Sequence, residues 1–457
     1  MRFSARNIFA PSSLYVASLV FLSLAGCHGK LRKTVKEKRV EAPVLVVPAP
    51  PAGPSLCVLT TEAKKIDQGL QTESPIPAAI ALSGKAYTIA WARTEAVENP
   101  EDFGTEEDTE DDAPTIIPEM GTLQIAKLSA GAKQASGVKR LTGERTGPKE
   151  LEFSSVGNSV VYFFQDEIGV HLLRRSLAGK PLPGSFQVKD AYGPSLAFTT
   201  KFGGLWLSWI SSCGLGGELK LYHLPAKDPN PSEAIALRTE NILCDQAGTA
   251  MASANGKLAL SWIVESPPPP KKGKPTANKI AFMYGDGEKG TFDEPVFISP
   301  ANSPVGGPSI SFSPDGKEAA IAWLVEGGAV GFTVVSSDGA VLVSPRLVPG
   351  SDGAKDLAAN LLSDPLYYGI SWSTKDSVWF GLLDRSGNMP TAPLLVGKGS
   401  RPNIIKGFAS KEYSLIYWRT EADSLISSKA LMFQQASCFA KPKKTPKKTT
   451  TPAPAKK

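Results

Sequence analysis

A short strand-like phrase that ends in tryptophan occurs six times along the chain, and it constrains the fold more than any other feature. In each copy an aliphatic residue stands two positions before the tryptophan, usually with alanine or serine between them. Side chains two apart share one face of a β-strand, so the aliphatic residue and the tryptophan lie together. The alanine or serine places only a small side chain on the other face, so a neighbouring sheet can approach closely. Such a pattern is typical of a strand buried on both sides. The six tryptophans are Trp91, Trp209, Trp262, Trp323, Trp372 and Trp418.

Turn signals precede and follow these strands at regular distances. Asp315-Gly316 stands just before the Trp323 strand, and Gly339 follows Trp323 by 16 residues. Such pairs supply the positive φ values or tight bends that short hairpins need. Each unit is therefore expected to be a four-stranded antiparallel meander.

The spacing between successive units indicates a radial repeat. Phe164 and Trp209 are 45 residues apart, Trp323 and Trp372 are 49 apart, and Trp372 and Trp418 are 46 apart. Repeats of roughly 40–50 residues with four strands are typical of propeller blades. With the degenerate unit around Phe164 the count is seven, which predicts an all-β fold, a seven-bladed β-propeller of four-stranded antiparallel blades. The alternatives are six or eight blades, or a β-sandwich with chance tryptophan spacing.

One turn carries a family resemblance. Ser313-Pro314-Asp315-Gly316-Lys317 resembles the WD40-like repeat of TolB-type bacterial propellers. The close match covers one blade, and the chain contains no Trp-Asp dipeptide. The resemblance implies a propeller fold and assigns no functional residue.

The first residues have the features of an export signal. Arg2 and Arg6 precede an apolar segment, Leu14–Leu24, which is too short to span a membrane. The sequence Leu24-Ala25-Gly26-Cys27 then resembles a bacterial lipobox. This resemblance implies a lipoprotein: residues 1–26 are a signal peptide that is removed, and Cys27 carries acyl chains such as palmitate. The alternative is an ordinary secretory signal followed by an unrelated cysteine.

The resemblance to lipoproteins also implies a location. His28 follows the cysteine, in place of the aspartate that often keeps bacterial lipoproteins in the inner membrane. We therefore expect an outer-membrane lipoprotein of the bacterial cell envelope, on its periplasmic or surface face.

Low-complexity segments flank the expected propeller. Residues 27–54 form a lipid anchor and flexible tether, with six basic residues and then a proline-rich run. The propeller is expected over residues 55–438. Residues 439–457 form a disordered tail rich in lysine, proline and threonine, without an acidic residue. The basic cluster of the tether either contacts anionic headgroups or is simply solvated.

Four cysteines remain after Cys27, and in an exported chain they suggest two disulfides. Four thiols allow three pairings, and their positions favour one of them. Cys57 precedes the first unit and Cys438 follows the last, so this pair would close the ring, with an N-terminal strand completing the last blade. Cys213 and Cys244 lie in connections on one end of the ring and would form the second bond. The alternative is four free buried thiols.

Two long insertions fall in the connections that follow tryptophan strands. Residues 95–112 contain ten acidic residues and no basic one, which indicates a disordered loop or a site for a cation or basic partner. Residues 267–274 are rich in proline and lysine. Both insertions belong to the same face of the ring as Cys213 and Cys244, and loop-borne function is expected there.

The search for catalytic and cofactor motifs is negative. The chain lacks the local signatures of zinc hydrolases, serine hydrolases, thiol redox proteins and nucleotide binders. We therefore assign no catalytic residue, no metal ligand and no cofactor, and we expect a binding or scaffold module more than an enzyme. The expected partners are the membrane, through the lipid, and an envelope protein or glycan, but not nucleic acid. The alternative is a glycan hydrolase that uses acidic residues from separate blades.

Overall fold

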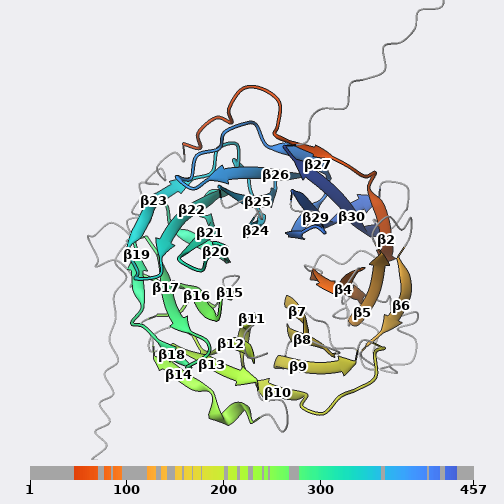
Figure 1. Ribbon diagram of the computed structural model, residues 1–457, viewed down its shortest axis with the longest axis vertical. Helices are drawn as coiled ribbons and strands as arrows, with labels where there is room; N and C mark the ends of the chain where they lie inside the picture. Colours follow the sequence, from red (N-terminus) through yellow and green to blue (C-terminus); the bar gives the residue numbers. More distant parts are fainter. Residues whose placement is uncertain are drawn as a thin grey trace, which may run out of the picture. The chain divides into compact units, whose positions relative to one another are not determined.

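Antiparallel pairing of neighbouring strands organises the described residues into seven sheets. The computed structural model describes residues 46–439 except 70–76, 84–85, 95–120, 130–134, 142–149, 157–158, 167, 177, 200–203, 214–216, 225–229, 239–240, 245–247, 267–276, 362–365, 409–410 and 422–427. All of the described residues belong to one compact unit, Leu45–Lys457. In this unit the sheets follow one another around a central axis, as the sequence predicted, and form a seven-bladed β-propeller (Figure 1).

The blades are numbered here in chain order, from the innermost strand outward. Blade 1 comprises β3 (Ala78–Ser83), β4 (Ala86–Thr94), β5 (Gly121–Ser129) and β6 (Ser136–Arg140). Blade 2 comprises β7 (Glu150–Val156), β8 (Ser159–Gln165), β9 (Gly169–Ser176) and β10 (Phe186–Lys189). Blade 3 comprises β11 (Tyr192–Thr199), β12 (Gly204–Ser212), β13 (Glu218–Leu224) and β14 (Ile235–Arg238). A single 3₁₀ turn, η1 (Pro231–Glu233), precedes β14 in this part of the chain.

The next three blades have the same order. Blade 4 comprises β15 (Thr249–Ala254), β16 (Lys257–Val264) and β17 (Lys279–Asp286), and two short segments, β18 (Thr291–Phe292) and β19 (Val296–Ile298), both pair with β17. Blade 5 comprises β20 (Pro304–Phe312), β21 (Glu318–Val325), β22 (Ala329–Ser336) and β23 (Val341–Leu347). Blade 6 comprises β24 (Asp356–Leu361), β25 (Tyr367–Ser373), β26 (Ser377–Asp384) and β27 (Leu394–Lys398).

Blade 7 joins the two ends of the described chain. It contains β28 (Ser400–Lys406), β29 (Glu412–Glu421) and β30 (Ser428–Cys438), and β1 (Cys57–Leu59) pairs antiparallel with β30. β2 (Lys64–Gly69) also pairs with β30, further along the same edge. The predicted closure of the ring by an N-terminal strand is therefore confirmed, although two short strands, β1 and β2, pair with β30 in place of one.

The meander order gives the ring two different faces. Turns between the first and second strands and between the third and fourth strands lie on one face, called the hairpin face. Connections between the second and third strands and between successive blades lie on the other, called the crossover face. Ser313–Lys317 is a hairpin-face turn, in which the Gly316 N–H donates to the Ser313 carbonyl at 2.9 Å. Each innermost strand therefore begins at the crossover face.

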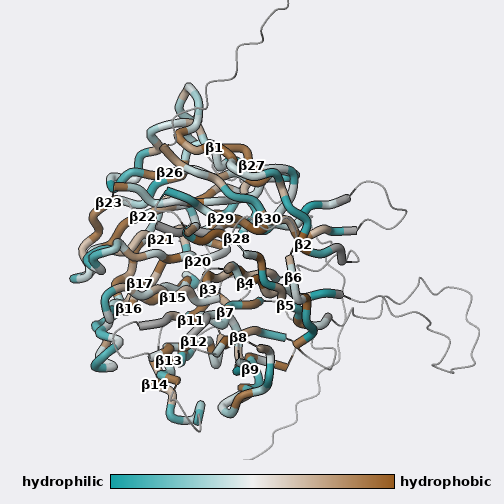
Figure 2. Tube along the Cα trace, turned by 45° about the vertical axis from the view of Figure 1, so that its right-hand side comes forward, coloured by the Kyte–Doolittle hydropathy of each residue, from teal (hydrophilic) through white to brown (hydrophobic). Residues whose placement is uncertain are grey.

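The core lies between adjacent blades. Ile321 and Trp323 pack in one cluster with residues of blade 4, such as Phe282. Ala320 and Ala322, on the opposite side of the same strand, pack in another cluster with Trp372 of blade 6. Figure 2 shows hydrophobic residues running along the strands and hydrophilic residues in many of the loops. The alternation along β21 is the one that the tryptophan phrase predicted.

Residues 46–56 form a strap along blade 6, outside its sheet (Figure 1). At the crossover face the Gly350 N–H donates to the Pro48 carbonyl at 3.0 Å. At the hairpin face the Leu56 N–H donates to Thr391 Oγ1 at 3.2 Å. The strap therefore contacts the propeller before residue 55, where the sequence predicts that the propeller begins.

Candidate ligand-binding channel

The innermost strands surround a channel with a polar wall. In the described part of the chain, each of these strands is the last in its sheet, so one edge has no strand partner. Such an edge presents main-chain N–H and C=O groups. Some of them bond to the next blade: the Met251 N–H on β15 donates to Ser195 Oγ on β11 at 2.9 Å. The wall therefore offers both donors and acceptors. The seven strands are β3, β7, β11, β15, β20, β24 and β28.

A cavity of about 230 Å³ lies between five of these strands. This volume is below the roughly 300 Å³ at which pockets for drug-sized ligands begin. The cavity is therefore suited to one small group. Its polar side chains are those of Glu152, Thr249, Ser309 and Asn403. The other residues that line it are Ala79, Ile80, Leu151, Phe153, Ala250, Met251, Pro308, Ile310 and Ile404.

Glu152 supplies the carboxyl group of the cavity lining. Its pKa is raised to about 8, mainly by burial and also by the charge of Glu150, while a hydrogen bond from the Leu196 main chain lowers it. Because the pKa lies above neutrality, the carboxyl group keeps its proton at pH 7. A protonated carboxyl group both donates and accepts hydrogen bonds.

Glu150 is the first residue of β7 and lies at the crossover-face end of the channel. Its carboxylate oxygens are 3.6 and 3.9 Å from the point that a Cβ on Gly248 would occupy. Burial raises the pKa of this carboxyl group, and the positive charge of Arg401 opposes the rise. The mouth thus brings together groups from blades 2, 4 and 7.

Arg401 has a left-handed backbone, with φ at 51°, which is costly for any residue with a Cβ. Its main-chain N–H donates to Asp356 Oδ2 at 3.0 Å, and its Nε lies 3.9 Å from Asp356 Oδ1. Burial lowers the pKa of the guanidinium, while Asp356 and Glu150 raise it. Arg401 is therefore held at the mouth by Asp356.

A repeated tripeptide, which sequence reasoning missed, shapes three of the innermost strands. Its members are Gly193-Pro194-Ser195 on β11, Gly307-Pro308-Ser309 on β20 and Arg401-Pro402-Asn403 on β28. Each lies where the strand pairing shifts register, and each first residue has a positive φ of 56°, 84° or 51°. Such bulges redirect side chains at functional edges. The recurrence of a residue followed by Pro and then Ser or Asn is the sequence signal that these three strands share.

The six tryptophans of the repeated phrase are buried, each on the second strand of its blade. The Trp91 Nε1–H donates to Asp67 Oδ2 at 2.8 Å. In blade 2 Phe164 takes the corresponding place and packs toward blade 1. None of the six tryptophans lines the cavity of the described structure.

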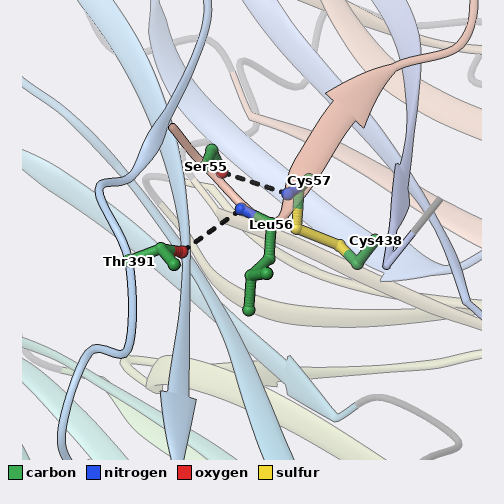
Figure 3. The surroundings of a disulfide bond; sticks show 5 residues. All are labelled: Ser55, Leu56, Cys57, Thr391 and Cys438. Atoms are coloured by element: carbon green, nitrogen blue, oxygen red, sulfur yellow. Dashed lines mark hydrogen bonds between the residues drawn. A yellow bond between two sulfur atoms is a disulfide. The ribbon is translucent and has the colours of Figure 1, made fainter. Parts of the chain in front are cut away.

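Both disulfides occur in the pairing that the sequence favoured. Cys57 and Cys438 join β1 to β30 at the hairpin face, beside the Leu56–Thr391 hydrogen bond (Figure 3). Cys213 and Cys244 join two connections of the crossover face. The two bonds therefore lie on opposite faces of the ring.

Several predicted features lie outside the described residues. They are Cys27, the signal peptide over residues 1–26, most of the tether, the acidic insertion (95–112), the basic insertion (267–274) and residues 440–457 of the tail. What the sequence indicates for these segments remains a prediction.

Similarity to known proteins is confined to the fold. No family profile matches the sequence, and no curated protein matches it. The structure is similar to the polysaccharide lyase Uly1 (TM-score 0.50, 9% identity, 84% of this chain and 100% of that chain). It is also similar to a prolyl endopeptidase (TM-score 0.44, 13% identity, 78% of this chain) and to TolB from Acinetobacter baumannii (TM-score 0.37, 13% identity, 61% of this chain). The chain spans 46% of the endopeptidase and 61% of TolB.

The described residues show neither a cluster of metal-ligand residues nor a membrane-spanning helix. Across these ranges, no three His, Cys, Asp or Glu residues are grouped so that they could hold a metal ion. The same part of the chain contains no helix that is long and apolar enough to cross a membrane.

Proposed function

We propose that this protein is a lipid-anchored binding module of the bacterial cell envelope that holds its ligand in the central channel. The lipobox-like sequence ending at Cys27 supports the anchor, and the outer membrane is the proposed location. Two disulfides support an oxidising compartment, because such bonds persist in exported proteins.

The observation that carries the binding role is the backbone of Arg401. Two equivalent positions, Gly193 and Gly307, carry glycine, which adopts a positive φ without cost. Arg401 adopts the same conformation at a cost of about 1 kcal/mol or more. A strained residue beside a polar cavity is typical of a functional site, so we assign the mouth of the channel to ligand binding.

The ligand is a component of the envelope, a glycan or a protein, that inserts a small polar group into the cavity. The size of the cavity limits the group that enters, while the crossover-face loops around the mouth can contact the rest of the partner.

The acidic residues of the channel fit a hydrolase less well. Glycosidases place two carboxyl groups on either side of the scissile bond. Glu150 and Glu152 project from one strand, so they belong to one wall of the channel. Asp356, on another blade, already accepts hydrogen bonds from Ser373 Oγ and the Arg401 N–H. Binding without turnover is therefore the favoured function.

Capture from envelope extract by the immobilised full chain tests this proposal. We expect Arg401→Ala to weaken retention of the partner by about tenfold, which corresponds to about 1.4 kcal/mol. Lys317→Ala, on the exposed hairpin-face turn, is the control and should retain the partner fully. Equal retention by the Arg401 variant, or glycan turnover that Glu152→Gln removes, would contradict the binding role of the mouth.

The anchor is tested separately by cell fractionation. Cys27→Ala should move the protein from the membrane fraction to the soluble fraction, and the mass of the wild-type N-terminal peptide should include acyl chains. Membrane attachment that survives this substitution would show that the lipobox interpretation is wrong.

A further inference from the structure

The cavity offers hydrogen bonds without a net ionic charge at neutral pH. Thr249, Ser309 and Asn403 are uncharged. The hydroxyl group of Thr249 already donates to the Gly193 carbonyl, whereas the side chains of Ser309 and Asn403 are of types that both donate and accept. Glu152 is protonated at this pH because its pKa lies at about 8. A ligand that enters the cavity therefore meets neutral groups of both kinds, together with main-chain groups of the innermost strands.

Main-chain groups share the lining with these polar side chains. The side chains of Ile80, Phe153, Met251 and Ile310 are buried in core clusters between the blades, so these residues present mainly their main chain to the cavity. A wall of hydrogen-bonding groups suits a ligand that carries several hydroxyl groups. A volume of about 230 Å³ suits a single ring of this kind rather than a longer segment.

The charges near the cavity disfavour an ionic ligand. On β7 the nearest acidic group is Glu150, which lies at the mouth. On β28 and β24 the charged groups are Arg401 and Asp356, which are engaged with each other. The main chain of Leu196 on β11 bonds to Glu152 and adds no charge. Because Arg401 and Asp356 offset each other, neither an anion nor an ammonium group finds an unpaired opposite charge in this pair.

We propose that the cavity binds one uncharged polyhydroxyl ring, a neutral sugar residue, with the Glu152 carboxyl group donating a hydrogen bond to a ring hydroxyl. Asn403 and main-chain groups of the wall bond to the neighbouring hydroxyl groups. This inference rests on the proposed binding role of the channel and names its ligand class.

Calorimetry of the full chain with matched sugars tests the ligand class. The probes are glucose, galactose and mannose, with the uronate and the 2-amino derivative of each. We expect at least one neutral sugar to bind about tenfold more tightly than both of its charged derivatives. Its affinity should fall by about tenfold between about pH 6 and about pH 9.5, as Glu152 ionises and loses its donor. Glu152→Gln keeps an uncharged donor and should bind equally at both pH values.

Glu326→Gln is the matched control, because Glu326 is exposed in a crossover-face turn outside the cavity. This variant should show the pH dependence of the wild-type protein. Tighter binding of a uronate or an amino sugar would overturn the neutral-ligand inference and leave the binding role of the channel intact. Binding of none of the probes would also overturn it, and the extract experiment would then decide the binding role on its own.

Discussion

Asp356 accepts a hydrogen bond from the main-chain N–H of Arg401, at 3.0 Å, across the boundary between blades 6 and 7. The same oxygen accepts from Ser373 Oγ at 2.6 Å, and the other oxygen lies 3.9 Å from Arg401 Nε. One carboxylate thus stabilises both the left-handed backbone and the side chain of Arg401. The geometry of the channel mouth therefore depends on the packing of two blades.

Replacing Arg401 separates backbone strain from side-chain function. Glycine adopts a positive φ freely, whereas alanine retains the strain, so Arg401→Gly should be more stable than Arg401→Ala by about 1 kcal/mol. Urea denaturation of both variants measures this difference. Both should bind ligand more weakly than the wild-type protein. An alanine variant that is as stable as the glycine variant would show that the backbone is unstrained.

Glu152 should make the free energy of unfolding depend on pH. The carboxyl pKa is about 8 in the folded protein against an ordinary value of 4.5, so the folded state binds more protons between these values. Its contribution to stability is therefore lost as the pH rises from about 5 to about 8, by up to about 1.4 kcal/mol per pH unit. Glu152→Gln should remove this part of the slope in denaturation measured across the range, while Glu326→Gln should not. Identical slopes for the wild-type protein and Glu152→Gln would contradict the raised pKa.

Trp323 should be a major contributor to stability. Its indole lies against Gly331, where an added Cβ would be 2.3 Å from the ring. Trp323→Ala should cost roughly 3–5 kcal/mol, as for other buried aromatic residues. Trp379→Ala is the control, because Trp379 is only partly buried and should cost less. Equal midpoints of denaturation for the two variants would show that Trp323 is not a wedge between blades.

The two disulfides should differ in their contribution to stability. The Cys57–Cys438 bond closes a loop with a sequence separation of 381 residues, against 31 for Cys213–Cys244. Chain entropy alone predicts a loss of about 6 kcal/mol for the first bond and about 4 kcal/mol for the second, as upper values. Paired serine variants, compared by chemical denaturation, measure the difference. A larger loss from the Cys213–Cys244 variant would show that ring closure does not depend on the first bond.

The sequence by itself determined the blades and their order. A strand that is buried on both faces needs the same residue pattern in every blade, so the tryptophan phrase and its spacing repeat along the chain. The two disulfides could be predicted for a related reason. Once the ring and its faces are known, the four cysteines have only one pairing that joins neighbouring positions.

Only the tertiary structure decided the site. The Gly-Pro-Ser and Arg-Pro-Asn tripeptides are visible in the sequence, but they line a channel only when the ring closes. Glu152, Asp356 and Arg401 lie on three separate blades, and no local spacing relates them. The proton affinity of Glu152 arises from burial between β7 and the neighbouring blades, and burial is a property of the assembled ring.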